Sequence, residues 1–464
     1  MILHNTNRNR YLFRRNYSVV PTFSFKSRLI RWSIAAIKSP LFYILIWCIT
    51  IRALYFSHLE SYSLAIDSIS YLNYPYDILR GEVNLYYTPG YPYFIKLIRK
   101  LVGEDLLLYT IPLVQTAIAL VAIVLFYFSA EKLFKSKRWA TVVTIYLGSL
   151  PQLMGWEKKV LTESISISGI ILLLAILVVY LDRPRSWLAF SSGLVCFVLI
   201  MVRPFSVIYL VILAVFWLAR ILLCRVEWKK SLVGFCSVLI CFGLMQGYSL
   251  MNLKANGYYG LSPIATCWNQ AYILISNGIY ENEDYPQITE NISQKIADGE
   301  ESSYQVFADA ALNNLGATIS EKYIKDTIFK NLPQYIEVVK NKTRNLLPQT
   351  INNSLAVIIN SKFIPWEKAL MQLLLPLNFL GAFILIGLEL LNAFVGWFRT
   401  KQMPWVDFGI SAFPSAIFVA SIVGSPADFA RLSVSAIPFL VLIIFINLQR
   451  LVLLIRNSET RKPL

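Results

Sequence analysis

Histidine and cysteine are both scarce in this chain of 464 residues, which has two histidines and six cysteines. Five of the cysteines fall in or beside apolar segments, and Cys267 alone lies in a long polar region. A disulfide framework needs several cysteines in one polar region, and a Cys/His metal site needs clustered ligands at short spacing. The sequence predicts neither, and His58 has no partner at ligand spacing.

Charged residues are also few. They make up 15% of the chain, against about 25% in typical soluble domains, whereas 56% of the residues are hydrophobic. This composition excludes an ordinary soluble globule. The formal net charge of +16 could suggest a nucleic-acid partner, but lysine and arginine occur in short stretches between apolar runs, the pattern that orients membrane helices. We therefore expect a multi-pass membrane protein that binds no nucleic acid.

Ten segments approach the length of about 20 apolar residues that is needed to cross roughly 30 Å of hydrocarbon. They begin near Leu41, Leu106, Trp139, Thr162, Trp187, Phe205, Ser231, Trp366, Pro404 and Leu432. The segment from Trp366 is long for one crossing, but two crossings there would invert the basic carboxyl tail. The sequence therefore predicts an all-α polytopic protein with about ten transmembrane helices.

The basic stretches fix the expected orientation. Residues 1–40 are basic and lack a small-residue cleavage site, so they are predicted to be a cytoplasmic tail. Residues 41–251 then form a transmembrane core with a first outside loop at 57–105, and residues 366–464 form the last three helices and a basic cytoplasmic tail. Every short inside loop is basic in this arrangement.

A second outside region is predicted at residues 252–365. Within it, apolar residues recur at helical spacing over 320–347, with a break at Pro333. Residues 280–303 are acidic and polar without a clear period, and we predict a flexible loop there. The outside region is therefore expected to be a helical appendage before the last three helices.

Four motifs lie in order along the chain, at predicted outer ends of helices. They are IRALYF at 51–56, DSISYL at 67–72 with ILRG at 78–81 and YTPGYPYF at 87–94, LTES at 161–164, and DFAR at 428–431. In these motifs the chain resembles the GT-C integral-membrane glycosyltransferases that use polyprenyl- or dolichyl-phosphate sugars. Similar members are bacterial proteins like the protein O-mannosyltransferases and the aminoarabinose transferase of lipid A.

The resemblance implies an enzyme that moves a hexosyl or pentosyl group from a polyprenyl-phosphate donor to a lipid, glycan or protein acceptor. The reaction takes place on the outer face of the membrane, and a bacterial inner (plasma) membrane is the implied location. The leaving phosphate is already a stable anion, so no general acid is needed. The site needs a carboxylate that accepts the proton of the acceptor hydroxyl, and cations that hold the phosphate.

Two acidic residues are the candidate catalytic groups. The resemblance assigns the general base to Asp67, which could instead cap the helix predicted after it. It assigns Glu163 the place of a second outside acidic residue that binds a metal or orients the acceptor. A charge at a helix start, favoured by the helix dipole, is an equally good interpretation of Glu163.

Basic and aromatic residues are the candidate substrate-binding groups. Arg203 and Arg431 can bind phosphate in a bidentate way, although an arginine at a helix end often reaches to lipid headgroups. Arg52 could neutralise Asp67 or help to bind the phosphate. Tyr87 and Tyr91 flank a Thr-Pro-Gly turn and could stack on a sugar or belong to the interfacial tyrosine belt. Lysines 158 and 159 fit headgroup binding better.

The chain departs from the family at two places. Many relatives carry two adjacent acidic residues in the first loop, whereas Ser68 follows Asp67 here, and Tyr87 and Thr88 stand where the aminoarabinose transferase has a lysine and an acidic residue. We therefore predict no metal site, and a divalent cation stays open as a cofactor. The alternatives are a transporter or flippase of lipid-linked saccharides and a polysaccharide polymerase. The absence of a convincing internal repeat argues against transport.

Overall fold

The computed structural model describes residues 39–57, 61–224, 226–264, 268–300, 302–349, 378–424 and 429–459. Most of the predicted cytoplasmic tail at 1–40, the predicted helix start at Trp366, and residues 460–464 lie outside these ranges, as do His58, Cys267 and Asp428. Within them every regular element is a helix, apart from one isolated bridge between Ser63 and Lys159.

Eight of the described helices are long and apolar enough to cross a membrane. They are α2 (Pro40–Ser57), α4 (Gly90–Phe134), α7 (Glu163–Asp182), α9 with the short η2 before it (Pro204–Leu223), α10 (Trp228–Asn256), α18 (Phe379–Thr400), α19 (Trp405–Gly424), and the run from α20 into α21 (Arg431–Arg456). The apolar helix α8 (Ser186–Val202) is shorter. The all-α, polytopic membrane fold is confirmed, although eight described helices reach full length where ten were predicted.

The helix predicted to begin near Trp139 is broken. It consists of α5 (Lys137–Gly148) and α6 (Pro151–Glu157). Proline has no backbone N–H and disfavours a helical conformation in the residue before it, and Leu150 is accordingly extended, with φ −73° and ψ 114°. Glu157, the last residue of α6, has its side chain buried inside the protein.

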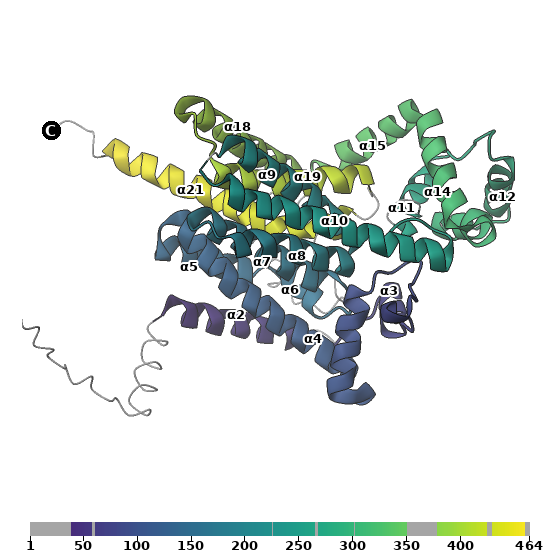
Figure 1. Cartoon of the computed structure of the whole chain (residues 1–464), viewed down its shortest axis with the longest axis horizontal. Coiled ribbons are helices and arrows are strands. Elements are labelled where there is room, and N and C mark those ends of the chain that lie inside the picture. The colour runs from purple at the N-terminus through teal and green to yellow at the C-terminus, as the bar shows by residue number, and fades with distance from the viewer. Residues whose placement is uncertain are drawn as a thin grey trace, which may run out of the picture.

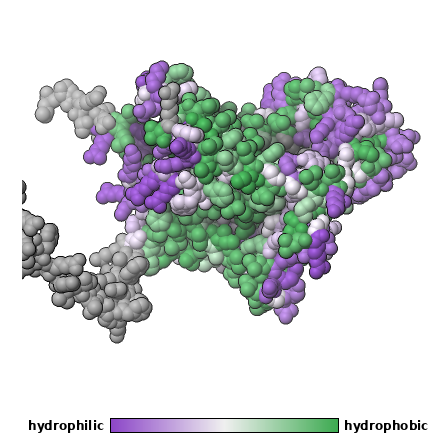
Figure 2. Space-filling model, viewed as in Figure 1, coloured by the Kyte–Doolittle hydropathy of each residue, from purple (hydrophilic) through white to green (hydrophobic). Residues whose placement is uncertain are grey.

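The helices form a bundle with an appendage at one end (Figure 1). The surface of the bundle is a hydrophobic band between two hydrophilic ends, as Figure 2 shows. This is the pattern of a membrane-spanning domain whose two ends are exposed to water. We call the end that carries the appendage the appendage end, and the opposite end the basic end.

The basic end contains the connections that follow α4, α7, α9 and α18. Basic residues gather in and beside these connections: Lys132, Lys135, Lys137, Arg138, Arg183, Arg185, Lys229, Lys230, Arg399 and Lys401. Lys132 Nζ lies 2.5 Å from Asp182 Oδ2, which joins the ends of α4 and α7. The predicted orientation puts this end in the cytoplasm.

The appendage has its own hydrophobic core. Its helices are α11 (Asn269–Ser276), α12 (Pro286–Ala297), α13 (Ser303–Phe307), the π-turn η4 (Ala308–Leu312), α14 (Asn313–Lys330) and α15 (Leu332–Leu346). The prediction of a flexible loop over 280–303 is wrong, because α12 lies there and buries Ile288 and Ile292 on one face. Pro286 in its first turn and the spacing of these two isoleucines were the missed signals.

Candidate active site

The loop after α2 carries Asp67 to the appendage end of the bundle. Its extended segment pairs with residues 158–160: the Ser63 N–H donates to the Lys158 carbonyl at 2.9 Å, and the Val160 N–H donates to the Ser63 carbonyl at 3.1 Å. Helix α3 (Ile66–Leu72) follows, and its Ser68 hydroxyl donates to the Val160 carbonyl at 2.8 Å. These bonds fix α3 beside the segment that leads to Glu163.

Asp67 does not cap α3. Ala65 is the capping residue, and its backbone N–H donates to Ser68 Oγ at 2.9 Å. The carboxylate of Asp67 is engaged elsewhere: Tyr87 donates its hydroxyl to Oδ1 at 3.2 Å, and Arg431 Nη2 lies 2.8 Å from Oδ2. The capping interpretation of Asp67 is therefore wrong. Asp67 keeps 27% of its side chain exposed, so it can be reached from solvent.

Glu163 is the first residue of α7, and its side chain is fully buried. Its Oε1 contacts two guanidinium groups, that of Arg431 and that of Arg203, whose Nη2 lies 3.4 Å away. The Thr162 hydroxyl approaches Oε2 at 3.4 Å. A buried carboxylate is costly unless it is paired, and here two arginines pair with it.

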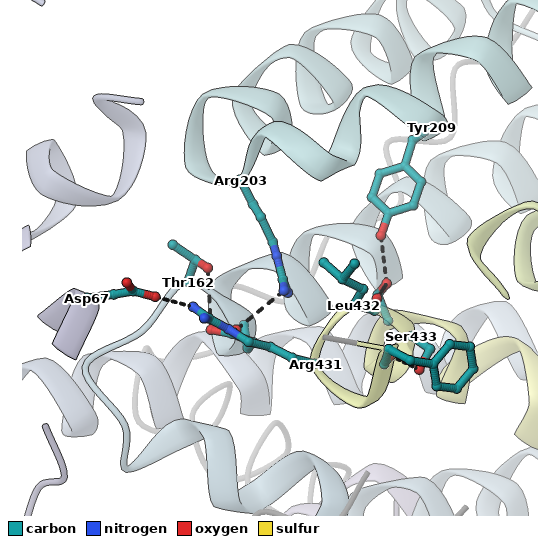
Figure 3. A network of polar contacts seen from close by, with 10 residues as sticks. Asp67, Thr162, Arg203, Tyr209, Arg431, Leu432 and Ser433 are labelled. Atoms are coloured by element: carbon teal, nitrogen blue, oxygen red, sulfur yellow. Dashed lines mark hydrogen bonds and ion pairs between the residues drawn. The ribbon is translucent and has the colours of Figure 1, made fainter. Parts of the chain in front are cut away.

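Arg431 connects the two carboxylates, as Figure 3 shows. It lies on α20 (Phe429–Ser433), far along the chain from both partners. Asp67, Glu163, Arg203 and Arg431 thus come together from four separate parts of the sequence, and we call them the charged cluster. Two negative and two positive formal charges balance in it. Each charge in the cluster thus has a partner of opposite sign, which offsets part of the cost of its burial.

Arg203 stands between α8 and η2. Its backbone is extended, with φ −149° and ψ 111°, because Pro204 follows it. The start of α4 packs tightly here: a Cβ placed on Gly90 would come within 2.5 Å of the backbone carbonyl carbon of Met201. Only glycine allows the beginning of α4 to approach the end of α8 so closely.

The two candidate tyrosines have different surroundings. Tyr87 borders the charged cluster, and burial together with the nearby Asp67 raises the pKa of Tyr87 to about 12, so its hydroxyl stays a donor. Tyr91 is fully buried and donates to Gln115 Oε1 at 3.0 Å. The ring of Tyr71 packs edge-on against both, with centroids 5.0 and 5.1 Å away. Tyr91 therefore packs beneath the site, against Tyr71, and has no solvent-exposed ring face on which a sugar could stack.

Arg52 does not neutralise Asp67. Its Nη2 lies 2.7 Å from Glu157 Oε1 and its Nε 2.9 Å from Oε2, while Nη1 donates to the carbonyls of Cys48 and Gly148. Arg52 and Glu157 are both buried. This pair joins α2 to α5 and α6, and every nitrogen of the guanidinium is engaged.

Two residues of the site were undervalued or missed in the sequence. Lys159 lies near the charged cluster: burial lowers its pKa, Glu163 opposes this shift, and Arg431 adds to it. Gln115 donates to the carbonyls of Glu157 and Lys159, at 3.0 and 2.8 Å, and so holds the segment on which Lys159 lies. A glutamine in the middle of an apolar helix is the signal that could have revealed Gln115.

The charged cluster offers no obvious metal site. In the part of the chain that the structure describes, no three His, Cys, Asp or Glu side chains lie close enough to hold a metal ion. Both carboxylates of the cluster already face guanidinium groups. The arrangement can accept a proton on Asp67 and can hold an anion between arginines.

No family model and no curated protein matches the sequence. Three solved structures of Archaeoglobus fulgidus oligosaccharyltransferase are similar in structure. One, a complex with Zn and sulfate, has a TM-score of 0.46 and 12% identity and covers 89% of this chain and 49% of the other. A second, AglB in complex with an inhibitory peptide and a dolichol-phosphate, has a TM-score of 0.44 and 11% sequence identity. The match covers 95% of this chain and 53% of AglB. The third, tethered to an acceptor peptide, has a TM-score of 0.45 and 12% sequence identity. The match covers 91% of this chain and 50% of the other. This chain therefore spans about half the length of these proteins.

Proposed function

We propose that the protein is a GT-C-type glycosyltransferase that moves a sugar from a polyprenyl-phosphate donor to an acceptor at the appendage end of the membrane. The observation that carries this proposal is the charged cluster, where the reachable carboxylate of Asp67 contacts Arg431, and Arg431 and Arg203 share the buried Glu163 at one end of the bundle. Asp67, Glu163 and Arg431, which belong to three of the motifs that carry the family resemblance, support the proposal because they meet in this cluster. A plasma membrane, bacterial by resemblance, is the location that fits.

Asp67 is the proposed general base. An acceptor hydroxyl attacks the anomeric carbon, its oxygen forms the new glycosidic bond, and its proton passes to the carboxylate of Asp67. The bond between the anomeric carbon and the phosphate oxygen breaks, and polyprenyl phosphate leaves with the electron pair. A hydrogen bond from Tyr87 orients the carboxylate, which is within reach of solvent and hence of an acceptor.

The arginines are the proposed phosphate ligands. Arg431 is 28% exposed and can turn from Asp67 towards a donor phosphate, which would release the carboxylate for proton transfer. Arg203 and Lys159 add positive charge beside it. Glu163 is the proposed positioning residue, since its buried carboxylate holds both guanidinium groups on one side.

A transporter fits the structure less well. Transporters hold their substrate near the membrane midplane between broken helices, whereas Glu163 is the first residue of α7 and Arg431 begins the run that continues into α21. The charged cluster therefore lies at helix ends. The identity of the sugar and of the lipid, glycan or protein acceptor stays open, as does a divalent cation.

The test is an assay with purified protein and a panel of polyprenyl-phosphate sugars. Mass spectrometry follows the release of polyprenyl phosphate, and a parallel assay in sealed vesicles follows movement of the intact donor. We expect release from at least one donor when an acceptor extract is present. Movement of intact donors across the vesicle membrane without any release would contradict the proposal and favour a flippase.

A further inference from the structure

The two adjacent lysines of the segment at residues 158–160, whose backbone pairs with Ser63, have different surroundings. Lys159 is within electrostatic reach of Glu163 and Arg431. Lys158 instead donates to the Ser61 carbonyl at 3.1 Å and lies 4.9 Å from the ring centroid of Phe56. The two adjacent lysines therefore serve different places.

Lys158 lines a cavity of about 370 Å³ between α2 and α4, which we call the α2/α4 groove. Its lining includes Ile49, Ala53 and Phe56 on α2 and Tyr109, Leu113 and Leu120 on α4, with Lys158 at the loop end. On each helix they follow the spacing of a single face. The volume falls within the roughly 300–1,000 Å³ that is usual for ligand sites.

The groove is reachable from the lipid. Ile49 is 52% exposed and Leu113 is 68% exposed, although both are apolar and lie on membrane-spanning helices. From Tyr109 to Leu120 the groove follows α4 for about 16 Å, at 1.5 Å per residue. A hydrocarbon chain can thus enter sideways and lie along the groove between two helices.

Among the described residues, the lining cation without a carboxylate partner is Lys158, at the loop end of the groove. Arg52 lines the groove, but Glu157 neutralises it and each of its nitrogens has a partner. Lys158 contacts no carboxylate among the described residues, and burial lowers its pKa. A partly buried ammonium group above an apolar groove matches an anionic headgroup on a hydrocarbon chain.

We propose that the α2/α4 groove binds polyprenyl phosphate, with the phosphate at Lys158 and the isoprenoid chain between α2 and α4. This inference rests on the proposed function and extends it, because polyprenyl phosphate is what the transfer releases. The groove has one helix on each side and a single cation at its end, which suits one chain and one phosphate better than a two-chain phospholipid. The spent carrier leaves the charged cluster past Lys159 and is held at Lys158 before it returns to the membrane.

Binding of undecaprenyl phosphate to the full chain in nanodiscs tests the proposal. Lys158→Gln should weaken the affinity about tenfold, the effect of one lost charge-assisted hydrogen bond, and Lys158→Arg should keep most of it. The matched control is Lys100→Gln, which removes an exposed lysine of α4 away from the groove and should change nothing. Ala53→Phe should fill the groove and weaken binding. Ile46→Phe should not, because the side chain of Ile46 is 48% exposed on α2 and does not line the groove.

A carrier with a photoreactive group in its chain gives the location independently. We expect crosslinks within residues 49–56 and 109–120. Crosslinks confined to other helices, an unchanged affinity in both Lys158→Gln and Ala53→Phe, or equally tight retention of phosphatidylglycerol would each overturn the proposal. Asp67→Asn should still bind and crosslink the carrier, so a failure of the groove is distinguishable from a failure of the proposed base.

Discussion

Each ion of the charged cluster depends on its partners, and Glu163 depends on them most. It is fully buried and faces two guanidinium groups, whereas Asp67 and Arg431 each keep more than a quarter of their side chains exposed. The proposed roles of the two carboxylates follow this difference in exposure: Glu163 holds the arginines, and Asp67 accepts the proton once Arg431 turns towards the donor phosphate.

Replacing Glu163 by glutamine should destabilise the protein. The change leaves Arg203 without a carboxylate and Arg431 with only one, and breaking a buried ion pair costs about 3–5 kcal/mol. Thermal unfolding in detergent measures the loss. Glu104→Gln is the control, since Glu104 is 71% exposed beside Arg99, and it should cost less than about 1 kcal/mol. Equal effects of the two substitutions would contradict the structural role of Glu163.

Tyr87→Phe should slow sugar transfer without weakening donor binding. The substitution removes the hydrogen bond to Asp67 and keeps the ring contact with Tyr71. A hydrogen bond to a charged group is worth about 1.5–3 kcal/mol, so the transfer rate should fall at least about tenfold. Single-turnover rates measure this effect, and Tyr76→Phe in the same loop is the control.

The effect of Tyr87→Phe should also be independent of pH. Because the pKa of Tyr87 is raised to about 12, its hydroxyl stays protonated and donates throughout the range of about pH 6 to about 9. The ratio of wild-type to variant rates should therefore stay constant over that range. A ratio that falls as the pH rises would mean that Tyr87 ionises near neutrality.

At the scale of helices, the close contact between α4 and α8 positions the site. The start of α4 carries Tyr91, and the end of α8 leads into Arg203. A second link ties α6 to α2 through Glu157 and Arg52. Gln115 of α4 bonds to carbonyls on both sides of Lys158, so three helices hold one short segment.

Gly90→Ala tests the contact between α4 and α8. A methyl group at Gly90 would meet the backbone of Met201 at 2.5 Å, and backbone cannot move aside easily. We expect lower thermal stability and at least a tenfold loss of transfer, as roughly expected when a site is displaced by about 1 Å. Gly247→Ala on α10 is the control, since nothing lies within 4 Å and alanine favours helix. Normal transfer by the Gly90 variant would show that the contact is not needed.

Composition and spacing predicted most of the membrane helices but not their partners. The apolar runs and basic loops predicted an all-α membrane protein, and they did so because lipid forces backbone hydrogen bonds inside each helix. Pro151 is the sequence signal for the break between α5 and α6. Asp67 and Arg431 lie 364 residues apart, so no local pattern could pair them. Arg52 pairs with Glu157 at the end of α6, and its spacing along the chain does not predict this contact.

In the molecule as a whole, ion pairs hold the last membrane helix at two positions along its length. Arg431 at its start reaches the charged cluster, while Arg450 in its later part lies 2.6 Å from Glu389 of α18 and 3.5 Å from Asp407 of α19. Charges inside a membrane are costly and need such partners. The cluster at the appendage end is therefore built on a helix that its neighbours hold along its length.

In the proposed reaction, Asp67 removes the proton of the acceptor during sugar transfer. Single-turnover transfer by Asp67→Asn, with donor binding measured in parallel, tests it most directly. Asp77→Asn, in an exposed turn of the same loop, is the control and should behave as wild type. We predict a loss of at least about a hundredfold in transfer with donor affinity kept, as expected for a missing general base. Transfer by Asp67→Asn at close to the wild-type rate would show that Asp67 is not the general base.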